Sequence, residues 1–225
     1  RDFPAADDSV WRGFPSLVSR SLETGREILC RSFSLFFVFF LSCELFSDKK
    51  IVTLKYKDMF ETSVYQNRRK KLMEKMSGGL VLILGNGEAP ANYTDNTYKF
   101  RQDSSFSYFF GLNLPGFAGV LDVDAGKEYI FGNDVDIDDI IWMGPQPLVK
   151  DLAARVGVET TFPFPELAVC LKEAISKGRR IHFLPPYRFR NMVLLEDLLG
   201  IHHSLIKTYA SLELIKAVVS LRSVK

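Results

Sequence analysis

Four closely spaced aspartates are the first candidates for chemistry, because carboxylate clusters bind calcium. They are Asp134, Asp136, Asp138 and Asp139. An EF-hand loop needs glycine at its sixth position and glutamate at its twelfth. Counted from Asp134, those positions hold Asp139 and Pro145. The pattern therefore excludes an EF-hand and is typical of a solvated acidic loop, or of a cap for the element that follows.

The histidines are the other candidate metal ligands. His202 and His203 are adjacent, and adjacent residues on a helix point in different directions, so we expect them not to converge on one metal. His182 lies in an apolar run of strand length, where we expect it to pack or to form hydrogen bonds. No carboxylates cluster near these histidines in the sequence, so we expect this chain to bind no metal by itself.

The cysteines and the short catalytic signatures add no site. Cys30, Cys43 and Cys170 lie far apart without C-x-x-C spacing, which argues against a zinc ribbon or a disulfide framework. We interpret Cys170, within an apolar helical pattern, as a buried free thiol. H-E-x-x-H, G-x-S-x-G and Walker motifs are absent. The glycines from Gly85 begin like a dinucleotide fingerprint, but Pro90 replaces the third glycine.

Composition describes an ordinary globular chain. Of its 225 residues, 47% are hydrophobic and 25% are charged, which is typical of soluble domains. With 29 basic and 27 acidic residues the net charge is +2. No field of one sign arises, so the charge gives no support for a nucleic-acid partner.

Residues 1–58 do not fit the remainder of the sequence. They contain a Phe-rich run over residues 34–46, preceded by arginines, which is shorter than the roughly 20 residues needed to span a bilayer. Three interpretations remain: an export signal, a buried strand or helix, or upstream sequence joined by a misplaced start. The last is favoured because regular patterning begins just after Met59, the first methionine. We expect low order over residues 1–50.

Apolar periodicity and glycine stops predict the elements that must position any site. A short helical turn capped by Asp103 or Ser104 holds Phe106, Phe109 and Phe110, and we expect this Phe-rich segment to form part of a contact surface. Strands alternate with helices, so the class is α/β with a mixed sheet. We expect helices over residues 65–76, 147–156, 165–177, 189–199 and 212–221, and strands over 80–85, on both sides of a turn at 124–126, and over 180–185.

The order of motifs over residues 67–144 carries a resemblance. An aromatic-Arg-Gln-Asp string is followed by Ser-x-Phe-x-Tyr, then Gly-x-x-x-Pro, then Ile-Trp-x-Gly, as in "FRQDSSFSYFFGLNLPG" and "IWMG". Each piece alone is weak, whereas the order and spacing are specific. From Met59 onward the chain resembles the N-terminal domain of Xaa-Pro aminopeptidases (aminopeptidase P), a family that includes prolidase and creatinase.

The resemblance implies an α/β domain with a mixed sheet flanked by helices, joined to a C-terminal catalytic domain. In the family that second domain holds two metal ions, usually manganese, through two Asp, one His and two Glu, and activates a water. No such ligand set can be carried over to this chain. We expect residues 1–58 to be a disordered or non-native extension, residues 59–217 to be the N-terminal domain, and residues 218–225 to begin the linker.

Motif position also implies roles for single residues. Trp142 of the Ile-Trp-x-Gly motif and Asp95 would lie near the active site of a neighbouring subunit. A Trp face packs well on proline, and a carboxylate can pair with a peptide amine. The plain alternatives are a packing role for Trp142 and a loop cap for Asp95. For Arg101 we expect a structural role, paired with Asp103 or with backbone carbonyls.

Two classes of function follow. The chain would be the accessory domain of a proline-specific aminopeptidase that acts on proline-containing peptides, with the catalytic domain and further copies of itself as partners. Alternatively, it would be a non-catalytic binding module of the same lineage. A third option is prolidase or creatinase proper. We expect a cytoplasmic protein with no nucleic-acid or membrane partner, and export would apply only if residues 1–58 are a genuine signal.

Overall fold

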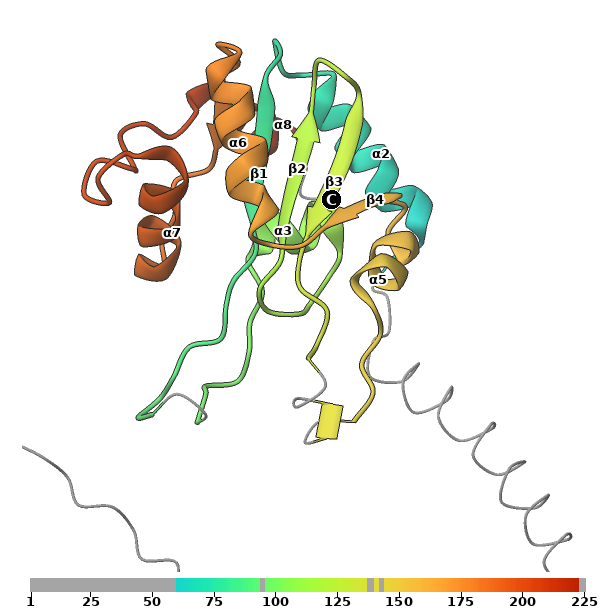
Figure 1. The fold of residues 1–225 in the computed structure, drawn as a ribbon. Coiled ribbons are helices and arrows are strands. Elements are labelled where there is room, and N and C mark those ends of the chain that lie inside the picture. Colours follow the sequence, from blue (N-terminus) through green and yellow to red (C-terminus); the bar gives the residue numbers. More distant parts are fainter. Residues whose placement is uncertain (1–59, 94–95, 137–139, 142–143, 223–225) are drawn as a thin grey trace, which may run out of the picture. The chain divides into compact units, whose positions relative to one another are not determined.

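The structure is a computed structural model that describes residues 60–93, 96–136, 140–141 and 144–222 (Figure 1). All of these residues lie in one compact unit, Lys50–Lys225. Within this described part of the chain, no helix is both long enough and apolar enough to cross a membrane.

A five-stranded mixed sheet forms the centre of the domain. Its strand order is β4-β3-β2-β1-β5. β2 pairs antiparallel with both β1 and β3, whereas β1–β5 and β3–β4 are parallel pairs. The α/β class and the mixed sheet are therefore confirmed. The strands are β1 (Leu80–Leu84), β2 (Ala118–Asp122), β3 (Lys127–Phe131), β4 (Thr160–Phe162) and β5 (Ile181–Phe183).

Helices cover both faces of this sheet (Figure 1). One face packs against α2, α3, α5 and α8, and the other packs against α6 and α7. Because both faces are buried, the interior strand β1 reads as the continuous apolar run LVLIL rather than as an alternating pattern. The helices are α2 (Thr62–Met73), α3 (Ser104–Phe110), α5 (Val149–Arg155), α6 (Glu166–Ser176), α7 (Phe189–Leu199) and α8 (Leu212–Leu221).

The expected elements are present, with two corrections. The three-residue strand β4 was not predicted, because it is too short to carry a period-two pattern and pairs only with β3. The Phe-rich helix α3 is not a contact surface. Phe106, Phe109 and Phe110 are each 0% exposed, because α3 packs against α2, β1 and β2.

Helix α8 extends across the expected domain boundary. The boundary placed after residue 217 falls inside this helix, which runs to Leu221. Leu214 and Val218 are buried in the core. The hydroxyl of Tyr108 donates to the carbonyl of Leu221 at 3.1 Å. The helix therefore belongs with this domain along its whole length.

A buried arginine links the elements on one face. The side chain of Arg69 in α2 is 0% exposed. Its Nε donates to Glu128 Oε2 on β3 at 2.8 Å, Nη1 donates to the carbonyl of Phe109 at 3.0 Å, and Nη2 donates to the carbonyl of Val156 at 2.9 Å. Burial lowers the pKa of the Arg69 guanidinium and raises the pKa of the Glu128 carboxyl, and the pairing of the two opposes both shifts. One side chain thus joins α2, β3 and the ends of α3 and α5.

We predict that Arg69→Met lowers the free energy of unfolding by about 3–5 kcal/mol, the range for removing one partner of a buried ion pair. The loss arises because Glu128 and two carbonyls keep their burial without a donor. Chemical denaturation measures it. Lys70→Met is the matched control, since Lys70 is the exposed neighbour on the same helix, and its effect should stay within about 0.5 kcal/mol. Equal losses in the two variants would contradict the assignment.

A second polar residue, His182, joins β5 to α8. It is 1% exposed. Its Nε2 lies 3.1 Å from the carbonyl of Gly78, and its Nδ1 lies 2.7 Å from Ser211 Oγ. A carbonyl can only accept, so Nε2 carries the proton and Nδ1 accepts from the hydroxyl. Ser211 Oγ in turn accepts from the backbone N–H of Leu214 and caps α8. The expectation that His182 packs and forms hydrogen bonds is confirmed.

His182 predicts how stability depends on pH. Burial lowers the pKa of its imidazole from the ordinary value of 6.5. As pH falls through this value, the unfolded chain takes up a proton that the folded chain does not. The free energy of unfolding should therefore fall as pH decreases below about 6.5, by up to about 1.4 kcal/mol per pH unit. Urea titrations across this window measure the slope, and an unchanged slope in His182→Gln would contradict the assignment.

Candidate functional site

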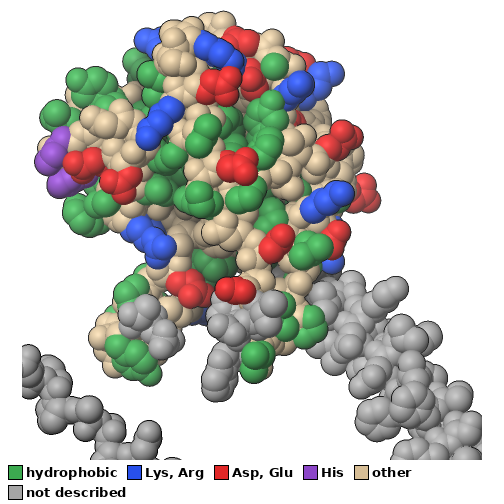
Figure 2. Space-filling view, viewed as in Figure 1, with side chains coloured by type: hydrophobic (Ala, Val, Ile, Leu, Met, Phe, Trp, Pro, Cys, Tyr) green, Lys and Arg blue, Asp and Glu red, His purple; other side chains and the backbone are tan. Residues whose placement is uncertain are grey.

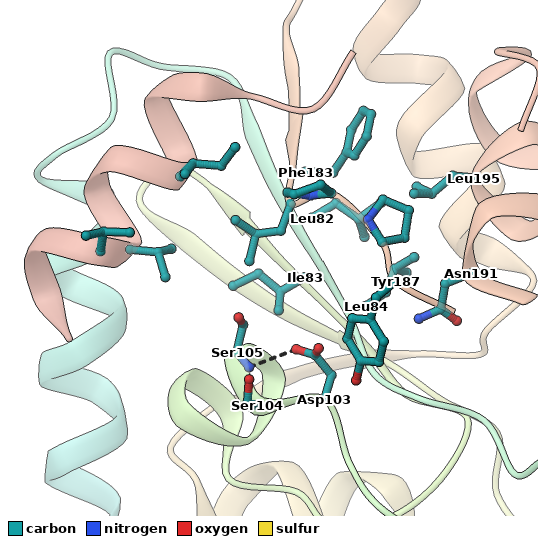
Figure 3. Close-up of a pocket in the computed structure, with 16 residues that line it drawn as sticks. Leu82, Ile83, Leu84, Asp103, Ser104, Ser105, Phe183, Tyr187, Asn191 and Leu195 are labelled. Atoms are coloured by element: carbon teal, nitrogen blue, oxygen red, sulfur yellow. Dashed lines mark hydrogen bonds between the residues drawn. The ribbon is translucent and has the colours of Figure 1, made fainter. Parts of the chain in front are cut away.

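A cavity of about 280 Å³ opens at the carboxyl ends of the parallel strands β1 and β5 (Figure 3). Apolar side chains make up most of its wall. Polar groups enter from two sides: the start of α3 and the segment that leads into α7. The polar lining residues are Asp103, Ser104, Ser105, Tyr187 and Asn191, and the apolar ones include Leu82, Ile83, Phe183 and Leu195.

The position of this cavity follows from the topology. In open α/β sheets, ligands bind beyond the carboxyl ends of parallel strands, where the connections on the two faces diverge. Here β1 leads toward α3 on one face, while β5 leads into α7 on the other. An apolar cavity with a few convergent polar groups can bind an apolar side chain or a short peptide segment.

Gln102 supports the backbone beside this cavity. Its Oε1 accepts from the backbone N–H of Asn86 at 2.7 Å and from that of Asp103 at 2.9 Å. Its Nε2 donates to the carbonyls of Leu112 and Leu114 at 3.0 Å and 2.8 Å. The buried amide is therefore fully hydrogen-bonded, and it holds three stretches of loop in place.

Asn86 extends this network toward the cavity. It is 0% exposed, and its Nδ2 donates to the carbonyl of Arg101 and to the Tyr187 hydroxyl, both at 3.0 Å. Among the described residues, its Oδ1 has no hydrogen-bond partner. An acceptor without a partner is costly in the interior, and here it sits one side chain away from the polar wall formed by Tyr187.

Asp103 caps α3 and so fixes one wall of the cavity. Its Oδ1 accepts from the backbone N–H of Ser105 at 2.8 Å (Figure 3). It also accepts from the backbone N–H of Phe106 at 2.9 Å. The cap satisfies donors that a short helix leaves open at its start. The helix ends at Gly111, whose φ of 68° suits a residue without a Cβ.

A second cavity, of about 450 Å³, lies on the face of the sheet that α6 covers. Its charged lining residues are Asp122, Glu166, Glu173, Lys177 and Arg179. Arg179 Nη1 donates to Asp122 Oδ2 at 3.0 Å, and its Nε donates to Asp124 Oδ2 at 2.8 Å. Burial by itself would raise the pKa of Asp122, but hydrogen bonds from Arg179 outweigh it and lower that pKa. The guanidinium is already neutralised, so the cavity between β1 and β5 is the stronger candidate.

The comparisons with known proteins decide the family. Residues 65–182, more than half of the chain, match the family described as "Aminopeptidase P, N-terminal domain". The chain belongs to this family. It is 34% identical to human Xaa-Pro dipeptidase over 89 residues, 36% of this chain and 18% of that protein. It is 31% identical to the Xaa-Pro aminopeptidase of Escherichia coli K12 over 107 residues, 46% of this chain and 24% of that protein.

Solved structures agree with this assignment. Escherichia coli aminopeptidase P in its low-pH form superposes with a TM-score of 0.52 at 26% identity, covering 63% of this chain and 33% of that one. The zinc-substituted enzyme in complex with product gives a TM-score of 0.54 at 25% identity, with the same coverage. The fold of the aminopeptidase P N-terminal domain is therefore confirmed, and the chain spans about a third or less of the length of these relatives.

The expected partnership of Arg101 is not observed in this aminopeptidase P domain. Arg101 is exposed, and within the described residues its side chain has no hydrogen bond or ion pair with Asp103. Its carbonyl accepts from Asn86 Nδ2 and from Arg188 Nη2. The reason is that Asp103 already accepts two backbone N–H groups at the start of α3. The structural role expected of Arg101 is instead played by Gln102 in this motif and by Arg69 in α2.

Trp142 and Asp95 lie outside the described residues. Their described neighbours belong to two long segments, between β3 and α5 and between β1 and α3, which leave the same end of the sheet (Figure 1). Both segments expose large side chains: Tyr93 and Tyr98 are 62% and 65% exposed, and Ile141 is 74% exposed. The substrate-proximal roles of Trp142 and Asp95 remain predictions.

Two other expectations about single side chains need correction. Cys170 is only partly buried, although burial still raises the pKa of its thiol. His202 and His203 do not diverge, because α7 ends at Leu199 and both follow it in a non-helical segment. Their ring centroids lie 4.1 Å apart.

In the acidic loop, Asp134 accepts from the backbone N–H of Val149 at 2.6 Å, so it caps the element that follows, as one interpretation expected.

We predict that substitutions at two neighbouring residues of the family motif change the free energy of unfolding by very different amounts. Gln102→Leu should lower the free energy of unfolding by about 3 kcal/mol or more, because it leaves buried backbone groups without partners. Arg101→Leu should change it by no more than about 0.5 kcal/mol, since that side chain is exposed. Thermal and urea denaturation of the two variants measure both effects. A larger loss for Arg101→Leu than for Gln102→Leu would contradict the assignment.

Proposed function

We propose that this chain is the N-terminal accessory domain of a larger, manganese-dependent Xaa-Pro aminopeptidase, which removes the residue that precedes proline at a peptide's N-terminus. In this proposal the domain shapes the substrate entrance and contributes to a homo-oligomer. The manganese ions and the hydrolytic step belong to a C-terminal catalytic domain, so the chain alone is inactive.

The family match over residues 65–182, together with the small share of each relative that is covered, is the observation that carries the proposal. The described part of the chain brings together only one group of three metal-ligating side chains, Glu196, His202 and His203. This group lacks aspartate and does not fit the two Asp, one His and two Glu of the family's metal centre.

Aminopeptidase activity is proposed in preference to dipeptidase activity. The matched family and the solved structures are those of aminopeptidase P, although Xaa-Pro dipeptidases are also among the curated relatives. The string FRQDSSF…GLNLPG over residues 100–116 also favours aminopeptidase P.

The long segments at one end of the sheet support a role at the substrate entrance. The segment between β1 and α3 carries Asp95, and the segment between β3 and α5 carries Trp142. An indole face would pack against the substrate's proline, and a carboxylate would pair with its amine. The exposed side chains of Tyr93, Tyr98 and Ile141 give these segments apolar area for contact with another subunit.

The test is a cleavage assay on the full-length protein encoded by the gene, with Mn²⁺ and an Xaa-Pro-Xaa tripeptide, next to the 225-residue chain. We expect cleavage by the full-length protein alone. Full-length Trp142→Ala should lose about tenfold in kcat/KM, the equivalent of one apolar contact of ~1.4 kcal/mol. The matched control is Tyr209→Ala, which removes an exposed aromatic between α7 and α8 and should leave cleavage unchanged.

A full-length protein that is inert with manganese and with other divalent metals would overturn the enzyme proposal. That result would favour the alternative, a non-catalytic peptide- or protein-binding module, with the cavity between β1 and β5 as the first place to look for its ligand. Full activity in Trp142→Ala would overturn the entrance role alone.

A further inference from the structure

Three side chains with metal-binding atoms meet at the end of α7. They are Glu196 in the last turn of the helix and His202 and His203 in the segment that follows, and one donor atom from each lies within 4.8 Å of the others. They are partly or fully exposed. Figure 2 shows histidine side chains at the edge of the molecule with acidic side chains beside them.

The end of the helix explains why these groups meet. Gly200 adopts a φ of 70°, and its N–H donates to the carbonyl of Glu196 at 2.8 Å, which turns the chain back across the helix end. Glu196 Oε2 then accepts from the backbone N–H of His203 at 3.0 Å and lies 2.6 Å from its Nδ1. The carboxylate thus holds both the backbone and the ring of His203 in place.

The second imidazole lies against the first. The ring centroids of His202 and His203 are 4.1 Å apart, with an angle of 33° between their planes. Phe189, at the other end of α7, packs edge-on against His203 with the centroids 5.4 Å apart. The ring of His203 is therefore held from both sides, and the pair presents two nitrogen donors at one place.

The local charge favours a cation. The carboxyl end of a helix carries partial negative charge, and Glu196 lies in its last turn. A glutamate side chain is ionised at neutral pH, as a metal ligand must be. Two imidazoles with one carboxylate are donors that zinc prefers, whereas calcium, magnesium and manganese prefer sites made of oxygen.

We propose that Glu196, His202 and His203 form a binding site for one zinc ion that joins the end of α7 to the segment leading into α8. Zinc binds imidazole nitrogen and carboxylate oxygen at about 2.0–2.2 Å. Small rotations would bring donors within 4.8 Å to those distances, and the partial exposure of the His203 and Glu196 side chains, 35% and 33%, leaves room for them. The fourth position would be open to water or to a side chain of a partner.

The experiment is calorimetric titration of the untagged 225-residue chain with zinc, followed by melting temperatures with zinc and with a chelator. We expect one zinc per chain and a melting temperature that rises with zinc concentration, because the metal binds the folded state. The double variant His202→Gln with His203→Gln should weaken binding by about 100-fold or more, since even outer-shell partners of a metal contribute 10- to 100-fold. Manganese should bind far more weakly.

Two further variants distinguish the loss of a zinc ligand from a loss of folding. His202→Gln alone removes one donor and leaves the pair between Glu196 and His203 intact, and it should also weaken zinc binding. Glu173→Gln is the matched control, because it removes another exposed carboxylate, paired with Lys177 on α6, and should leave binding unchanged. Zinc bound with equal affinity by the double variant is held elsewhere, for instance by thiols, and overturns the proposal. Failure of the native chain to bind zinc also overturns it.

Discussion

One whole face of this domain depends on the ion pair and hydrogen bonds of the Arg69 guanidinium. It is fully buried, and it joins α2 to Glu128 on β3 and to carbonyls at the ends of α3 and α5. A buried cation is stable only when hydrogen-bond acceptors pair with its N–H donors in good geometry. The planar fork of arginine can meet several acceptors at once, which the single ammonium of lysine cannot do. The helices on that face are therefore positioned around this side chain as well as by apolar packing.

A similar constraint operates at the carboxyl ends of β1 and β5. Gln102 fills its hydrogen-bonding capacity with backbone groups of the surrounding loops, and Asp103 caps α3. In the motif by which the family is identified, Gln102 and Asp103 thus mainly bind backbone groups and fix the surrounding loops. In the proposed function, such a domain would contribute shape to a larger enzyme. Two further polar residues of the cavity wall, Tyr187 and Asn191, come from the other side, where the chain enters α7.

Two parts of the domain surface have different characters. At one end, long segments with exposed aromatic and aliphatic side chains leave the sheet, and the proposed substrate entrance lies there. At the end of α7, two imidazoles and a carboxylate gather at a helix terminus. The first feature requires a partner domain to have a function, whereas the second can act within this chain. Each is built on a helix or sheet end, where the backbone leaves regular structure and side chains from separate segments can meet.

The sequence by itself determined the class of fold and nearly every element, because apolar period, caps and glycine stops are local signals. The order of motifs around Gln102 also indicated the family. The sequence could not single out Arg69 from Arg68, Lys70 and Lys71, since the four consecutive cations look alike and only one is buried. Nor could it show that His202 and His203 meet, because that depends on where α7 stops. Only the tertiary structure decided these points, since the partners of Arg69 lie 40 to 87 positions away and burial depends on which distant segments pack together.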